Sequence, residues 1–193
     1  MITKEKTKAF IDRAYACAEN NGFHDKELSV EHCLMLVITE ISEAVEADRK
    51  GKREAPIDPA SYMKYEHETA EVRAEWLTFL YNANIKGSVE EELADVCIRL
   101  YDLCGMMDIE PTYYDYGIKG KTFQDIPYRT FTERCFFLCT LITNCDVDVR
   151  DAIGSSLQFV YCMCEDMGID LERHIELKME YNESRPMKHG KKY

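Results

Sequence analysis

The sequence predicts an all-α protein built as a helical bundle. Apolar residues recur at intervals of three and four positions in one segment after another, which is the period of an amphipathic helix. No segment shows the alternation of apolar and polar residues that would favour a strand. Gly51, Gly87 and Gly105 follow periodic segments, where glycine commonly ends a helix.

Two helices are predicted before Gly87, separated by a loop that contains Pro56 and Pro59. The first covers about residues 31–50 and ends at Gly51. Its apolar stripe consists of Leu34, Val37, Ile38, Ile41 and Val45. The stripe of the second helix consists of Tyr65, Val72, Trp76, Leu77 and Leu80.

The clearest helix start lies at Ser88, which has Glu91 three positions later in a capping-box arrangement. This helix should end near Gly105, and its stripe consists of Leu93, Val96, Leu100 and Leu103. A loop rich in Tyr, Gly and Pro is expected over 111–128. Three further helices are then marked by Phe136, Phe137, Leu141 and Ile142, by Ile153, Leu157, Val160 and Tyr161, and by Leu171, Ile175 and Met179.

The two halves of the chain resemble each other weakly. A shift of sixty positions aligns Tyr101, Cys104 and Ile109 with Tyr161, Cys164 and Ile169. We therefore expect one domain over 1–193, with a metal-binding half at 1–110 and a degenerate copy at 129–193 that serves as scaffold and substrate wall. Chance alignment of amphipathic helices is the alternative.

Composition limits the classes of function. The 193 residues suffice for one substantial core, and no apolar stretch of secretory or membrane-spanning type is present. A net charge of −12 disfavours duplex nucleic acid as a partner. The nine cysteines include no Cys-x-x-Cys pair, which favours thiols packed in a core over disulfides or zinc. We expect a soluble cytoplasmic protein with no membrane partner.

Two pairs of carboxylates border the apolar stripes, Glu40 with Glu43 and Glu92 with Asp95. Residues three positions apart share a helix face, so two such faces can supply oxygen ligands for Mg²⁺ or Mn²⁺. The alternatives are a solvated helix face or ion pairs, for which Arg49 and Arg99 would provide only part of the charge.

A basic segment lies at the other end of the chain. Its helical face at i, i+3, i+4 and i+7 consists of Lys178, Tyr181, Asn182 and Arg185, with Lys188 and Lys191 as further candidates. Cations and an amide at this spacing suit a compact polyphosphate. A solvated helix end is the alternative.

Three segments together resemble a known family. TEISEAVEADRKGK (39–52), VEEELADVCIRLYDLC (89–104) and HIELKMEYNESRPMKHGKKY (174–193) are similar to MazG-like nucleoside triphosphate pyrophosphohydrolases of the all-α NTP pyrophosphatase superfamily. The resemblance covers most of 20–105 and 165–193.

The resemblance implies hydrolysis of a nucleoside triphosphate between the α and β phosphates, with Mg²⁺ held by Glu40, Glu43, Glu92 and Asp95. Glu40 or Glu43 would be the general base. The basic motif would bind the triphosphate through Lys178, Tyr181, Asn182 and Arg185, with Lys188 and Lys191 as additions.

The chain departs from the family pattern at Thr39, where many relatives have another Glu, and in the basic motif, which follows about eighty residues after Glu-x-x-Asp. The motif must therefore fold back or reach a neighbouring subunit. A homodimer is expected by resemblance, and a monomer becomes credible if the duplication is real.

The substrate stays open at this stage. Hydrolysis of dUTP or phosphoribosyl-ATP, and a non-catalytic nucleotide-binding module, are the alternatives. Phe23, His24 and Trp76 are candidates for stacking on a base, and ordinary packing explains each equally well.

Overall fold

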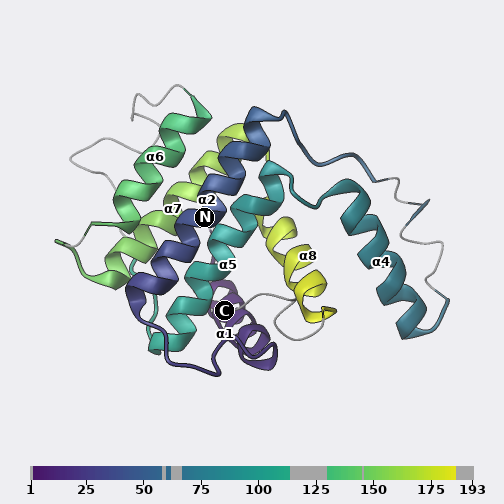
Figure 1. The fold of residues 1–193 in the computed structure, drawn as a ribbon, viewed down its shortest axis with the longest axis horizontal. Helices are drawn as coiled ribbons and strands as arrows, with labels where there is room; N and C mark the ends of the chain where they lie inside the picture. The colour runs from purple at the N-terminus through teal and green to yellow at the C-terminus, as the bar shows by residue number, and fades with distance from the viewer. Residues whose placement is uncertain (1, 58–59, 62–66, 114–129, 145, 186–193) are drawn as a thin grey trace.

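The computed structural model describes residues 2–57, 60–61, 67–113, 130–144 and 146–185. Within these ranges the regular elements are all α-helices, and the prediction of an all-α protein is confirmed (Figure 1). The helices are α1 (Lys4–Asn20), α2 (Val30–Arg49), α4 (Ala70–Asn84), α5 (Val89–Met107), α6 (Phe131–Ile142), α7 (Val149–Met167) and α8 (Leu171–Glu183).

The helices predicted from apolar stripes are present, but the stripes of two of them were partly wrong. Val72 and Leu77 of α4 and Phe136 of α6 are exposed, because these helices bury other residues, such as Tyr81 and Leu138. The expected helix at 31–50 is α2, which ends before Gly51, a residue with a φ of 64°. Ser88 caps α5 by accepting a hydrogen bond from the backbone N–H of Glu91. The Glu91 carboxylate completes the cap one residue earlier than in a standard capping box, because it accepts from the N–H of Gly87.

One helix was missed and some predicted features fall outside the described residues. The sequence analysis did not predict α1, whose buried residues are Thr7, Phe10, Ile11 and Ala14. A stripe that depends on threonine and alanine is a weak hydrophobic signal. Tyr65 and most of the loop expected over 111–128 lie outside the described residues.

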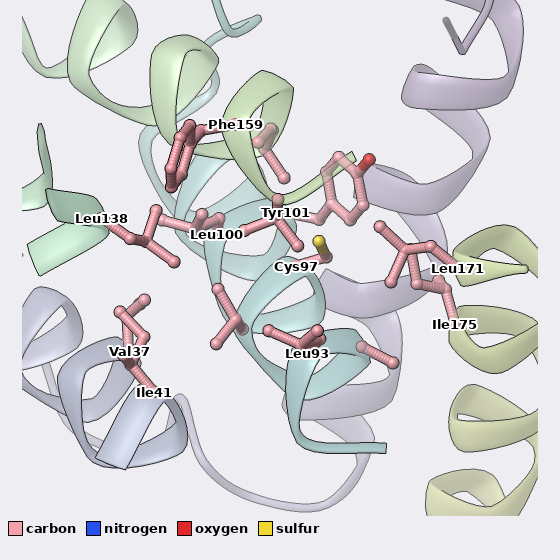
Figure 2. Packing of buried hydrophobic residues seen from close by; sticks show 14 of the residues in the cluster. Val37, Ile41, Leu93, Cys97, Leu100, Tyr101, Leu138, Phe159, Leu171 and Ile175 are labelled. Carbon is pink, nitrogen blue, oxygen red and sulfur yellow. The ribbon is translucent and has the colours of Figure 1, made fainter. Parts of the chain in front are cut away.

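The core is organised around α5, which packs against α1, α2, α7 and α8. Figure 2 shows Leu93, Cys97 and Leu100 of α5 surrounded by apolar side chains of the neighbouring helices. Cys97, like Cys104, is fully buried, and every described cysteine is a free thiol. Half of the described thiols, including Cys97 and Cys104, are buried and pack as small apolar residues, as the sequence predicted.

The sixty-residue correspondence extends to both ends of a helix pair. Helices α5 and α7 each have 19 residues, and their N-caps are Ser88 and Asp148. Their C-caps, Asp108 and Gly168, are both in the left-handed conformation. The internal duplication stays a prediction, which this agreement in length and capping favours.

The arrangement of α2, α5 and α8 positions the candidate site. Helix α5 contacts α2 on one side and α8 on another, so the carboxylate pairs and the basic segment approach one another across α5. Figure 1 shows α4 beyond α8, at the edge of the molecule. Among the described helices, none combines the length and the apolar character needed to span a membrane.

Candidate metal and anion site

A cavity of about 420 Å³ opens between α1, α2, α5 and α8. All four predicted metal ligands line it, together with three residues of the basic segment. These seven residues are Glu40, Glu43, Glu92, Asp95, Lys178, Asn182 and Arg185. One chain therefore brings its acidic and basic motifs to the same cavity, and the basic segment folds back within the chain.

Three of the predicted ligands form a compact group. Glu40 and Glu43 from α2 and Glu92 from α5 each offer a carboxylate oxygen, and these oxygens lie within 4.8 Å of one another. Glu40 and Glu92 are only 5% and 7% exposed, whereas Glu43 is exposed. Three carboxylates so close together repel one another unless a cation or protons offset their charge.

Asp95, the fourth predicted ligand, is bound to a lysine. Its Oδ2 lies 2.6 Å from Nζ of Lys178, which also donates a hydrogen bond to Glu91. Lys178 is buried, and it reaches α5 from α8 one turn before the end of that helix. The structure therefore places Asp95 beside the group of three carboxylates, held by an internal cation.

Glu40 also has an internal partner, since Nε of Arg99 lies 2.5 Å from its Oε1. Arg49, the other arginine considered as a partner, pairs with Glu46 at the surface instead. Arg99 on α5 thus neutralises part of the acidic charge, as the ion-pair alternative proposed, and Lys178 neutralises another part at Asp95.

The environment of the cavity raises the pKa of two of its carboxyl groups, Glu92 and Asp95. Burial, with repulsion from Asp95 and Glu91, raises the pKa of Glu92 to about 8. Burial also raises the pKa of Asp95, against the opposing effect of Lys178. Burial by itself would lower the pKa of Lys178, but Asp95 and Glu91 outweigh it, so the pKa is raised and the lysine stays charged.

The balance of charge around the cavity suits a divalent cation. With every carboxyl group ionised, six acidic side chains and four basic ones line the cavity, a formal excess of two negative charges apart from His24. The proton that Glu92 retains has to leave when a cation binds there. The acidic residues are Glu40, Glu43, Glu91, Glu92, Asp95 and Asp102, and the basic residues are Lys86, Arg99, Lys178 and Arg185. Carboxylate oxygens are the ligands that Mg²⁺ and Mn²⁺ prefer, so the donor set fits the predicted ion.

The basic segment divides between two environments. Lys178, Asn182 and Arg185 line the acidic cavity, but Tyr181 does not. Its ring stacks on Tyr81 with centroids 4.4 Å apart, and its hydroxyl donates to Asn82 at 3.1 Å. Tyr181 thus holds α8 against α4, beside a second cavity of about 460 Å³. Lys188 and Lys191 lie outside the described residues.

The three aromatic residues considered for base stacking also separate. Phe23 and His24, in the connection between α1 and α2, line the acidic cavity. Trp76 does not, because it lies on α4, where its indole N–H donates to the carbonyl of Ser61 and its ring stacks on Phe79.

Several residues that line the cavity were not among the predicted site residues, including Lys86, Glu91 and Asp102. Glu91 is 2% exposed and accepts hydrogen bonds from Lys178, from Gly87 and from the Tyr81 hydroxyl. The run Glu90-Glu91-Glu92 was an available signal, but the capping-box arrangement with Ser88 assigned Glu91 only to the start of the helix.

No protein-family model matches the chain, and neither a curated protein nor a solved structure matches it.

Proposed function

We propose that this protein is a Mg²⁺-dependent nucleoside triphosphate pyrophosphohydrolase, which releases a nucleoside monophosphate and pyrophosphate. The observation that carries the proposal is one cavity with a carboxylate group on one wall and cationic side chains on another. Glu40, Glu43 and Glu92 supply the acidic wall, and Lys178 and Arg185 the cationic one. Such a cavity matches a triphosphate that arrives with divalent cations.

The acidic wall would hold the cation through Glu40, Glu43 and Glu92, with Asp95 beside them. When bound, Mg²⁺ supplies positive charge for the triphosphate and acidifies a water molecule. Glu43 is the better candidate for the general base, since Glu40 is engaged by Arg99 and Glu43 is exposed. A base must reach the water from which it takes a proton, and an exposed carboxylate at the cavity can do so.

The cationic wall would bind the phosphates that leave. Lys178 is charged and lines the cavity, and Arg185, which also lines it, lies two residues beyond the end of α8. Both can stabilise the negative charge that grows on pyrophosphate as the bond between the α and β phosphates breaks. Asn182 adds an amide that can donate to phosphate or sugar oxygens.

The direct test measures products from a panel of NTPs and dNTPs, with Mg²⁺ and with EDTA. We expect nucleoside monophosphate and pyrophosphate in equal amounts, only with Mg²⁺. Nucleoside diphosphate and phosphate as products would show cleavage between the β and γ phosphates, which would contradict the proposal. Binding of triphosphates without any hydrolysis would contradict the proposal and favour a nucleotide-binding module.

A matched pair of variants on α2 tests the carboxylates. Glu43→Gln should reduce turnover by about 100-fold or more, the effect of losing one group that acts directly on the reacting charge. Glu46→Gln is the control, because Glu46 is exposed one turn later on the same helix and does not line the cavity. Equal activity of the two variants would contradict the assignment of Glu43.

A further inference from the structure

One part of the cavity contains none of the residues proposed to bind the metal ion or the phosphates. Its walls there are apolar, and they come from the C-terminal half of α1, the connection to α2, the first half of α2 and the middle of α5. The residues are Ala14, Ala18, Phe23, Leu28, Cys33, Leu36 and Ile98. The flat faces of a nucleobase suit a cavity of this lining, since burial removes them from water while the polar edge of the base still needs hydrogen-bond partners.

His24 and Asp102 form a polar pair at this apolar end, where Asn21 also lines the cavity. Nε2 of His24 lies 2.8 Å from Oδ1 of Asp102, and the His24 ring stacks on Tyr15 with centroids 5.0 Å apart. Both members of the pair line the cavity, where the side chain of His24 is 14% exposed and that of Asp102 is 27% exposed. The pair joins two segments 78 residues apart in the sequence.

The hydrogen bond between His24 and Oδ1 of Asp102 leaves the other carboxylate oxygen, Oδ2, available to a ligand. Asp102 raises the pKa of His24 against the effect of burial, so the imidazole is favoured as the donor and Oδ1 as the acceptor. Among the described residues we find no hydrogen bond to Oδ2 of Asp102. An ionised carboxylate accepts hydrogen bonds and donates none, so the ligand group that meets Oδ2 must be a donor.

The separation along α5 matches a nucleotide. Asp95 and Asp102 both line the cavity and are seven residues apart, so they lie on one face of α5 and about 10 Å apart along its axis. That span is comparable to the distance from the α phosphate of a nucleotide to the hydrogen-bonding edge of its base. A triphosphate bound at the acidic turn would thus direct its base toward Asp102.

Resting on the proposed function, we infer that Asp102, oriented by His24, reads an exocyclic amino group of the nucleobase. The site then prefers cytosine over uracil and adenine over hypoxanthine. Within each pair the first base presents an N–H₂ donor where the second presents a carbonyl oxygen, which would face the Asp102 carboxylate without a hydrogen bond. A site built to bond one polar group rejects the analogue that lacks it more strongly than an apolar wall does.

The test compares binding of α,β-methylene analogues of CTP, UTP, ATP and ITP by calorimetry with Mg²⁺ present. The methylene group prevents the proposed cleavage, so affinity is measured apart from turnover. We expect the amino-bearing analogue to bind at least about tenfold more tightly within at least one pair. Equal affinities within both pairs would overturn the inference.

Asp102→Asn separates base reading from a purely structural link. The amide oxygen can still accept from His24, and the amide N–H₂ now offers a donor to the base. We expect this variant to reverse the preference within the discriminating pair and to keep the parental melting temperature. If the contact between His24 and Asp102 were only structural, the substitution would instead weaken the binding of all four analogues by the same factor. Asp12→Asn is the control, since Asp12 is exposed and pairs with Lys8 away from the cavity.

Failure of this inference can be told from failure of the proposed function. Pyrophosphate release from CTP and UTP at equal kcat/KM, with equal analogue affinities in both pairs, would overturn the inference and leave the function intact. If none of the four analogues binds and no triphosphate is hydrolysed, the proposed function is overturned and the inference with it.

Discussion

Three consecutive glutamates show how position on a helix decides the role of a residue. Successive residues of a helix point about 100° apart, so Glu90, Glu91 and Glu92 face different neighbours. Glu90 accepts from the backbone N–H of Glu54, and Glu91 accepts from Lys178. Glu92 faces the carboxylates of α2. Glu90 therefore has a structural role, Glu91 positions Lys178, and Glu92 is a candidate metal ligand, although the three side chains are identical.

Glu91 lies outside the group of three carboxylates, and its loss should destabilise the fold through its buried hydrogen bonds. Glu91→Ala leaves the Tyr81 hydroxyl and the Gly87 N–H without this acceptor and removes one of the two carboxylates that bind Lys178. We expect a loss of about 3 kcal/mol in the free energy of unfolding, measured by urea denaturation.

The control for Glu91→Ala is Glu46→Ala. Glu46 also takes part in ion pairs, but its side chain is 48% exposed, and surface pairs contribute about 1 kcal/mol or less. A loss for Glu91→Ala no larger than that for Glu46→Ala would show that the buried contacts of Glu91 contribute little.

At the scale of elements, α8 is the helix on which the candidate site most depends. It is fixed at its start, where Lys6 of α1 binds Glu172, and near its end, where Arg13 of α1 binds Glu183. Between them, Arg173 donates two hydrogen bonds to the Glu54 carboxylate in the connection after α2. These contacts hold α8 so that its basic residues face the carboxylates of α5.

Acidification should weaken this docking through His174. The imidazole is buried and its Nε2 lies 3.1 Å from Glu54, while Nδ1 has no hydrogen-bond partner among the described residues. Burial lowers the pKa of His174 below its ordinary value despite the attraction of Glu54. The folded protein then binds fewer protons than the unfolded chain, so this stabilising contribution is complete above about pH 6.5 and is lost as the pH falls through the folded-state pKa.

The measurement is the free energy of unfolding between pH 7 and pH 5. His174→Asn, which cannot be protonated, should show a shallower decrease on acidification than the parent. His67→Asn removes an exposed imidazole outside this network and should retain the parental profile. Superimposable profiles for His174→Asn and the parent would show that His174 is not the group responsible.

At the scale of the molecule, one chain supplies both walls of the candidate site. The carboxylates of α2 and α5 and the basic residues of α8 line the same cavity, so the basic motif needs no neighbouring subunit to reach them. We expect pyrophosphate release per chain to stay constant on dilution, with mass followed by light scattering. A fall in specific activity that parallels dissociation of an oligomer would contradict this prediction.

The sequence predicted helix α2 and the stripe of α5 well because both signals are local. Caps such as Ser88 and breakers such as Gly51 act within one turn, and apolar periodicity identifies the buried face without knowledge of its partner. Helix α1 escaped prediction because its buried face includes Thr7 and Ala14, which are not distinctive in a hydrophobic pattern.

Most of the carboxylates and cations that line the candidate site could be predicted from the sequence, but several of the residues they pair with could not. The spacing of Glu40 and Glu43 puts both on one face, and the structure brings Glu92 to them. The sequence could not show that Lys178 would bind Asp95, because that pair depends on how α8 packs against α5. Tyr181 likewise shares a helical repeat with Lys178 but turns toward α4.

The sequence by itself determined most of the helices, the buried faces of α2 and α5 and the local groups of acidic and basic residues, since hydrogen bonds and side-chain periodicity within a helix need only neighbouring residues. The tertiary structure decided which faces meet. It joined His24 to Asp102 and Lys178 to Glu91, contacts that span 78 and 87 residues. Such contacts arise from the packing of α1, α2 and α8 on α5, which buries apolar surface that no single helix can bury alone.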